Sequence, residues 1–128
     1  MQKLVIDTNI FISYLLSKNG FSFKIVDTLL IKENAIHFVS DKTLQEYFTL
    51  FNRERFTKKR SDFLKTSYLL YNSILHLSIK VNPVKAFNLI KDESDNRFLN
   101  VAYAANADYL ITGNKLHFIF LVNFTIHK

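Results

Sequence analysis

The chain contains no cysteine among its 128 residues. It can therefore form no disulfide, no zinc site built on thiolates and no thiol nucleophile. Any chemistry has to come from carboxylate, imidazole, hydroxyl and amide groups. The histidines occur singly, without the spacing of metal ligands on one helix, and we interpret them as structural: His37, His76, His117 and His127.

Glycine and proline are almost as scarce. The two glycines, Gly20 and Gly113, are far apart, so the sequence has neither a glycine-rich phosphate-binding loop nor a G-x-S-x-G nucleophile turn. Nucleotide binding of the Rossmann type is therefore disfavoured. Pro83 is the single proline, and no stretch rich in Pro, Gly or Ser separates two parts of the chain. We predict one domain over residues 1–128.

Long apolar runs are also missing. The first run, residues 4–6, ends at Asp7 and is too short for a signal peptide, and no later run approaches the length of a membrane span. We therefore expect a cytoplasmic protein that is not attached to a membrane.

The chain is rich in apolar and in basic residues. Hydrophobic residues make up 48% of the sequence, with 13 Phe and 6 Tyr, which is the composition of a packed globular core. The formal net charge of +6 favours an acidic partner, most commonly nucleic acid. Much of this charge falls in one span with interleaved aromatic residues, and we predict that it binds RNA through Arg53, Arg55, Lys58, Lys59 and Arg60. The alternative is a helical corner that faces water.

Short apolar strands alternate with amphipathic helices along the chain. Strands are predicted at residues 3–6, 35–39, 77–81, 108–112 and 120–126. Helices are predicted at residues 10–17, 22–32, 41–51, 61–75, 83–90 and 95–105. Strands separated by helices imply parallel crossover connections. We therefore predict an α/β fold, a three-layer α/β/α sandwich with a central parallel sheet of four to five strands.

Acidic side chains stand where this fold would bring them to one edge of the sheet. Asp7 ends the first strand, and Glu46 lies in the second turn of the helix after the second strand. Asp92 and Asp95 open the helix before the fourth strand, and Asn114 follows that strand. Open α/β sheets bind ligands at the carboxyl ends of their strands. We therefore expect these side chains to converge on a divalent metal ion.

Each acid also has a simpler interpretation. Asp92 and Asp95 can be an N-cap and a first-turn acid that the helix dipole favours. Glu46 taken alone would be an ordinary solvated helix residue. Asp7 is the exception, because a charged group that ends an apolar strand is costly unless it is paired or bound to a metal.

Four blocks of the sequence together resemble the PIN domain family. The blocks are Val5-Ile6-Asp7-Thr8-Asn9-Ile10, Glu46 on its helix, Asp95-Asn96-Arg97-Phe98-Leu99 followed by Ala102, and Tyr109-Leu110-Ile111-Thr112-Gly113-Asn114. Their order, spacing and places on strands and helices match the family, and the resemblance covers about residues 3–116. The chain is most similar to the VapC-like subgroup, the toxin components of bacterial toxin–antitoxin systems.

The resemblance implies a metal-dependent endoribonuclease that cuts single-stranded RNA. By position, Asp7, Glu46 and Asp95 would be its catalytic and metal-binding acids, and Asn114 would be a fourth ligand where the family has an acid. Four further residues match its supporting polar positions: Thr8, Asn9, Asp92 and Thr112.

Oxygen ligands of this kind suit the hard cations Mg²⁺ and Mn²⁺, which can activate water and relieve charge on a phosphodiester. Three acids and a neutral amide carry less negative charge than four acids. We therefore expect one tight metal position among Asp7, Glu46 and Asp95, and a weaker second position near Asn114.

Two interpretations of the whole protein remain open. As a toxin it would have an antitoxin as its protein partner, and its wealth of aromatic residues favours a homodimer. The residues in question are Tyr47, Phe48, Phe51, Tyr68 and Tyr71. The alternative is a catalytically weakened PIN domain that binds RNA or protein without cutting, which the amide at Asn114 would favour.

Overall fold

The structure is a computed structural model that describes residues 1–17, 20–53, 62–83, 93–112 and 119–121, without the side chains of residues 93–96 and 119–121. The strands are β1 (Lys3–Ile6), β2 (Ile36–Val39), β3 (Ser78–Lys80), β4 (Tyr109–Ile111) and β5 (Ile119–Leu121). The helices are α1 (Thr8–Leu16), α2 (Phe21–Ile25), the π-helix η1 (Val26–Ile31), α3 (Asp41–Phe51), α5 (Phe63–Leu77) and α6 (Glu93–Ala105). Every predicted element within the described residues is present, and the helix predicted at residues 83–90 lies outside them.

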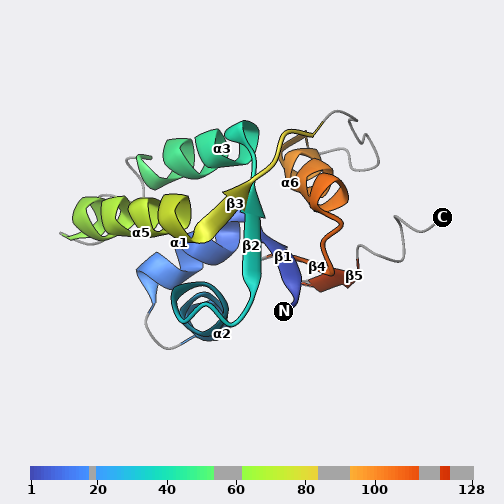
Figure 1. The fold of residues 1–128 in the computed structure, drawn as a ribbon. Helices are drawn as coiled ribbons and strands as arrows, with labels where there is room; N and C mark the ends of the chain where they lie inside the picture. The colour runs from blue at the N-terminus through green and yellow to red at the C-terminus, as the bar shows by residue number, and fades with distance from the viewer. Residues whose placement is uncertain (18–19, 54–61, 84–92, 113–118, 122–128) are drawn as a thin grey trace.

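The strands form one sheet in the order β3-β2-β1-β4-β5 (Figure 1). β1 pairs in parallel with β2 and β4, and β3 pairs in parallel with β2. β5 pairs with β4 in the antiparallel direction. The connection at residues 112–118 is shorter than the dozen or so residues that a parallel crossover requires, and β5 therefore returns antiparallel.

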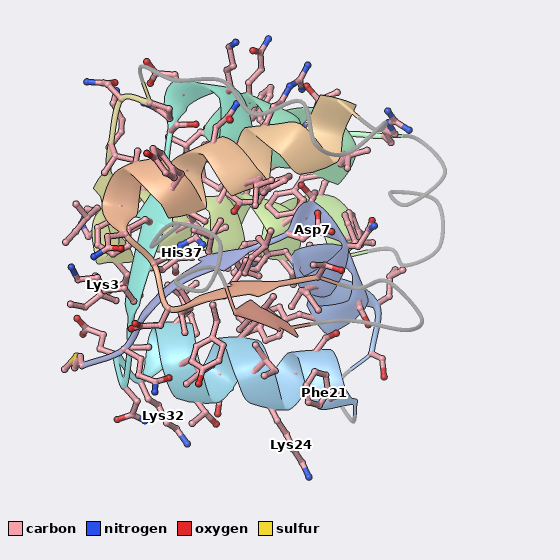
Figure 2. The ribbon with its side chains drawn as sticks, turned by 90° about the vertical axis from the view of Figure 1, so that its right-hand side faces the viewer. Lys3, Asp7, Phe21, Lys24, Lys32 and His37 are labelled. Carbon is pink, nitrogen blue, oxygen red and sulfur yellow. The ribbon has the colours of Figure 1, made fainter. Side chains whose placement is uncertain are left out.

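Helices cover the sheet on both sides, which confirms the predicted three-layer α/β/α fold. Figure 2 shows α6 on one side of the strands, and α2 with η1 on the other. The most deeply buried side chains include Val5 and Ile6 of β1, Phe11 of α1, and Phe98 and Val101 of α6. β1 lies between two parallel neighbours and is covered on both faces, so it needs apolar residues on both.

The predicted helix at residues 22–32 is present, but its second half is a π-helix and not an α-helix. It begins as α2 and continues as η1, where the N–H of Lys32 donates to the carbonyl of Asp27, five residues earlier, at 3.0 Å. The buried positions of this segment are four residues apart, at Ser22, Val26 and Leu30. In a segment that combines α-helical turns with wider π-helical turns, residues four positions apart lie on the same side of the helix.

The apolar residues of α3 and α5 are divided between core and surface. On α3, Tyr47 and Phe51 are buried, whereas Phe48 is 56% exposed and its ring lies 5.7 Å from that of Tyr71 on α5. Tyr68 on α5 is 67% exposed. The two helices pack together, but their contact leaves part of their apolar side chains exposed to solvent.

The parallel strands bring polar residues to one edge of the sheet. Ile6 of β1 is paired with Ile111 of β4, so Asp7 and Thr112 follow neighbouring strands at the same edge. Helix α3 begins at this edge too, directly after β2. The carboxyl ends of the strands are the place where an open α/β sheet binds its ligands.

Candidate functional site

Asp7 directly follows β1 and is the N-cap residue of α1. Its N–H donates to the carbonyl of Ile111 at 2.8 Å, and its own carbonyl accepts from the N–H of Ile10 at 3.1 Å. The neighbouring strand and the following helix therefore fix its backbone. Asp7 is 8% exposed and stands at the edge of the sheet (Figure 2). A carboxylate this buried is stable only beside compensating groups.

Tyr47 shows that Glu46 lies near Asp7. The buried Tyr47 hydroxyl donates to the carbonyl of Ile6, the residue before Asp7. Burial raises the pKa of this hydroxyl well above its usual value, and the negative charges of Asp7 and Glu46 raise the pKa further. Tyr47 directly follows Glu46 and Ile6 directly precedes Asp7, so this hydrogen bond brings the segments that carry the two acids together at the end of β1.

A cation from α6 contacts Glu46. Arg97 Nη1 donates to Glu46 Oε1 at 3.1 Å. The two side chains are 33% and 16% exposed, so the pair is partly shielded from water and attracts more strongly than a pair on the open surface. Next to it, the ring of Phe98 lies 5.6 Å from the ring of Tyr47. These contacts join α6 to α3 beside the end of β1.

Two buried threonines belong to the same edge. Thr8 is 1% exposed, and its Oγ1 has no hydrogen-bond partner among the described residues. Thr112, directly after β4, is also buried, whereas Asn9 is exposed. A buried hydroxyl without a partner calls for a bound water or ligand. Carboxylate and hydroxyl oxygens are the donor atoms that a hard divalent cation prefers, and Asp7 and the two threonines supply such atoms at this edge.

The other predicted ligands lie outside what the structure describes. The backbone of Asp95 is in the first turn of α6, but its side chain is not among the described atoms, and Asp92 and Asn114 fall in the undescribed segments. Within the described part of the chain, no three acidic, histidine or cysteine side chains are grouped so that they could hold a metal ion. The full ligand set therefore stays a prediction.

The predicted RNA-binding span is described only at its start. Arg53 is exposed just after the end of α3. The rest of the span lies outside the described residues: Arg55, Lys58, Lys59 and Arg60. Its role also stays a prediction.

Two residues of this site were not predicted. Apolar spacing places Tyr47 in the core, but its hydroxyl contact with Ile6 depends on how α3 packs against β1. Arg97 stands two positions after Asp95. A basic residue this close to predicted acidic ligands is the one feature of the sequence that could have indicated that Arg97 belongs to the site.

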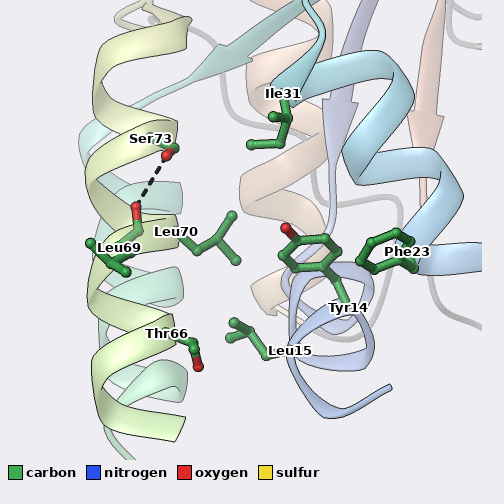
Figure 3. A pocket seen from close by; sticks show the side chains of 8 residues that line it. All are labelled: Tyr14, Leu15, Phe23, Ile31, Thr66, Leu69, Leu70 and Ser73. Atoms are coloured by element: carbon green, nitrogen blue, oxygen red, sulfur yellow. Dashed lines mark hydrogen bonds between the residues drawn. The ribbon is translucent and has the colours of Figure 1, made fainter. Parts of the chain in front are cut away.

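A cavity lies away from this edge of the sheet. A cavity of about 230 Å³ lies between α1, the α2–η1 segment and α5 (Figure 3). It is lined by Tyr14, Leu15, Phe23, Ile31, Thr66, Leu69, Leu70 and Ser73. These residues are mostly apolar and none of them is an acid, and the Ser73 hydroxyl donates to the Leu69 carbonyl at 3.1 Å. The described lining therefore offers no carboxylate, in contrast to the edge at Asp7.

Comparison with known proteins identifies the family. The sequence matches the family model described as PIN domain over residues 3–116. The chain belongs to the PIN domain family. It is also 36% identical, over 116 residues, to an uncharacterized protein of Methanocaldococcus jannaschii, in an alignment that covers 88% of this chain and 71% of that protein. No solved structure matches the chain with comparable significance.

Membership of the PIN family indicates a nuclease-type function and nucleic acid as the partner, and PIN domains are in general metal-dependent nucleases. The match is to the PIN domain as a whole and does not place the chain in the VapC-like subgroup. Among the described residues, no helix is both long and apolar enough to cross a membrane.

Proposed function

We propose that this PIN domain is a metal-dependent endoribonuclease that cuts single-stranded RNA at the edge of the sheet where Asp7 lies. The observation that carries the proposal is the contact of the buried Tyr47 hydroxyl with the Ile6 carbonyl, because Glu46 precedes Tyr47 and Asp7 follows Ile6. Asp95, in the first turn of α6, would supply the third acid, and Asn114 would supply an amide oxygen.

The proposed ligands for Mg²⁺ or Mn²⁺ are the carboxylates of Asp7, Glu46 and Asp95. When bound, such an ion supplies a nucleophile from water at neutral pH and stabilises negative charge on the phosphoryl group. The Thr8 hydroxyl, buried and without a partner among the described residues, would orient a water molecule or a phosphate oxygen. Tyr47 keeps its proton because its pKa is raised, so it positions the end of β1 and takes no part in proton transfer.

RNA is proposed as the substrate because of the net charge of +6 and the family resemblance. Phosphate contacts from basic side chains supply most of the affinity of a small domain for nucleic acid. Arg53 and the basic residues that follow it would bind the strand on either side of the cut. Asn9, Asp92 and Thr112 are proposed as supporting polar groups at the site.

We also propose that the protein is the toxin of a toxin–antitoxin pair, located in the cytoplasm. This rests on the similarity of its third and fourth blocks to VapC-like proteins. The antitoxin would cover the acidic edge and so block access of RNA to Asp7. Expression with and without the product of the adjacent reading frame tests this: growth arrest should be relieved only when both are present.

A homodimer is proposed from the apolar surface between α3 and α5. A groove of about 280 Å³ lies there, lined by Phe48, Phe51, Asn52, Leu64, Ser67, Tyr68, Tyr71 and Asn72. Phe48, Leu64 and Tyr68 are each more than half exposed. Of the aromatic residues considered for a dimer, Tyr47 and Phe51 are already buried within one chain, which leaves Phe48, Tyr68 and Tyr71.

The alternative function is binding without cleavage, and Asn114 favours it. An amide in place of a fourth acid weakens the attraction for a second divalent ion. Such a protein would bind RNA or another protein through the same edge and leave the strand intact.

One experiment separates the two functions. Labelled single-stranded RNA is incubated with the wild-type protein over a range of Mg²⁺ and Mn²⁺ concentrations. Cleavage should require the metal and stop with EDTA. Asp95→Asn should slow cleavage by roughly 100-fold or more, because it removes a ligand charge. Asp27→Asn, which removes an acid of η1 that pairs with Lys32 at 3.3 Å, is the control.

Asn114→Asp completes the test. It should shift the metal dependence of cleavage to lower concentrations, because a carboxylate near two cations gains an attraction that an amide lacks. RNA that is bound by the wild-type protein but never cut, at any metal concentration, would favour the binding function instead.

A further inference from the structure

Arg97 is a cation inside an acidic site. Its Nη1 lies 3.1 Å from Glu46 Oε1, and the two side chains come from different helices, α6 and α3. Glu46 in turn acts electrostatically on the same Tyr47 hydroxyl as Asp7. The positive charge of Arg97 therefore stands where the proposed function places a divalent metal ion.

Arg97 and a metal ion at Glu46 compete. The two positive charges repel each other at short range, and a guanidinium that donates to Glu46 Oε1 occupies an oxygen that the metal would use. Arg97 is thus the counter-ion of Glu46 in the structure. A metal ion bound to Glu46 Oε1 would have to displace it.

We propose that Arg97 exchanges Glu46 for a phosphate group of the RNA when the metal binds, and so is a phosphate-binding residue of this site. The inference rests on the proposed function, since it deepens how the same site takes its substrate. Its side chain is 33% exposed, so the guanidinium borders on solvent and can turn to a ligand. Guanidinium groups bind phosphate through two parallel N–H···O bonds.

The acidic site needs such a group. Asp7 and Glu46 repel the negative phosphodiester, and a single divalent ion only balances their two charges. An Arg97 released from Glu46 has its positive charge and its N–H donors free for the phosphate. Substrate and metal would therefore bind cooperatively through this one side chain.

A purely structural role is the alternative. The Arg97–Glu46 pair also ties α6 to α3, and removing one partner of a shielded ion pair destabilises a protein. In that case the loss of Arg97 would lower stability but would change the affinity for metal and phosphate in the same direction, or not at all. The two roles are therefore separable by binding measurements.

The first test is calorimetric titration with Mn²⁺ of the wild-type protein, Arg97→Met and the control Lys24→Met. Lys24 is an exposed cation on α2 (Figure 2), so its loss changes the net charge equally. Arg97→Met should bind Mn²⁺ at least roughly fivefold more tightly than the wild type, the lower end of typical coupling between ligands. Lys24→Met should match the wild type. In a Glu46→Gln background the effect of Arg97→Met should disappear.

The second test uses uridine 5′-monophosphate, which carries a phosphate but no phosphodiester to cut. At saturating Mn²⁺, Arg97→Met should bind it at least roughly fivefold more weakly than the wild type. Tighter metal binding combined with weaker phosphate binding is the expected pattern. Mn²⁺ affinity in Arg97→Met equal to or below that of the wild type overturns this inference alone. Absence of Mn²⁺ binding in both folded proteins overturns the proposed metal site as well.

A measurement on the wild-type protein covers the case in which Arg97→Met does not fold. The Nε–H resonance of Arg97, assigned with Arg97→Lys in ¹⁵N-arginine-labelled protein, is followed during a Mg²⁺ titration. It should shift and sharpen as Mg²⁺ releases the guanidinium from Glu46. A resonance that stays unchanged while calorimetry records Mg²⁺ binding overturns the exchange.

Discussion

His37 is a buried imidazole in the middle of the sheet, 1% exposed. Its Nδ1 lies 2.6 Å from the Ser78 hydroxyl, and its Nε2 has no hydrogen-bond partner among the described residues. The ring packs edge-on against Phe11, at 5.8 Å, and beside Tyr47. Burial lowers the pKa of His37 to about 3, so the ring is neutral in the folded protein. The interpretation of this histidine as structural agrees with these contacts.

The neutral His37 predicts a loss of stability at mildly acidic pH. Its folded pKa of about 3 is below the ordinary 6.5, so the unfolded chain binds the extra proton as the pH falls below 6.5. The free energy of unfolding should therefore decrease by about 1.2 kcal/mol between pH 6 and pH 5, since the unfolded imidazole is not fully protonated at pH 6. Urea unfolding at pH 7, 6 and 5 measures this decrease. In His37→Leu the free energy of unfolding should fall less steeply with pH, by the contribution of His37.

His76 provides the control for this prediction. It is an exposed histidine at the end of α5, so His76→Gln should keep the wild-type slope. Equal slopes in His37→Leu and the wild-type protein would show that His37 is not the group responsible.

At the scale of elements, α3 matters most, because it carries Glu46 and Tyr47. Its start is held by a capping box, in which Ser40 Oγ accepts from the N–H of Thr43 at 3.2 Å and Thr43 Oγ1 accepts from the N–H of Ser40 at 2.9 Å. Both residues are buried. The box fixes where the helix leaves β2, and hence where its second turn presents Glu46.

Removal of this cap should destabilise the protein measurably. Ser40→Ala leaves the N–H of Thr43 without its acceptor in a buried place, and N-cap substitutions of this kind cost about 0.5–2 kcal/mol. Urea unfolding at pH 7 measures the change. Thr49→Ala, an exposed position on the same helix, should change the free energy of unfolding by less than about 0.5 kcal/mol. Equal effects of the two substitutions would contradict a role for the cap.

At the scale of the whole molecule, charge and apolar surface decide what the protein binds. The net charge is +6, and the acidic edge at Asp7 is a local exception within a basic chain. A basic exterior attracts nucleic acid from a distance, and its contribution falls with added salt. The exposed aromatic groove between α3 and α5 is a separate surface, formed by other residues.

The basic span predicts a specific salt dependence. Lys58→Ala with Lys59→Ala should weaken binding of single-stranded RNA and reduce the slope of log affinity against log salt by roughly 1.4, about 0.7 for each lost phosphate contact. Fluorescence anisotropy at several salt concentrations measures this. The matched control removes two charges elsewhere, Lys24→Ala with Lys32→Ala, and should leave the slope nearly unchanged. Identical slopes in all three proteins would indicate a solvated corner.

The exposed groove predicts a dimer that a charged substitution in the groove should dissociate. Tyr68 lines the groove, so Tyr68→Lys should turn a sedimenting dimer into a monomer, because an unpaired charge in an apolar interface is costly. Leu69→Lys is the matched control, since Leu69 is 56% exposed on the same helix but does not line the groove. A wild-type protein that sediments as a monomer at high concentration would rule the dimer out.

Much of the fold follows from local patterns. The alternation of apolar strands and amphipathic helices is a property of neighbouring residues, and the parallel order of β1, β2, β3 and β4 follows from the helices between them. The same topology places Asp7 and Thr112 at one edge, because each directly follows a strand. This part of the candidate site was therefore predictable without coordinates.

Other features depend on packing between distant segments. Whether Tyr47 or Phe48 is buried is decided by how α3 lies against β1 and α5, although apolar spacing treats the two alike. The contact of Arg97 with Glu46 joins side chains 51 positions apart, and no local pattern encodes it. Spacing along a helix specifies which residues share a face, but the neighbour that meets that face, and with it the charge beside Glu46, follows only from the folded arrangement of α3, α6 and β1.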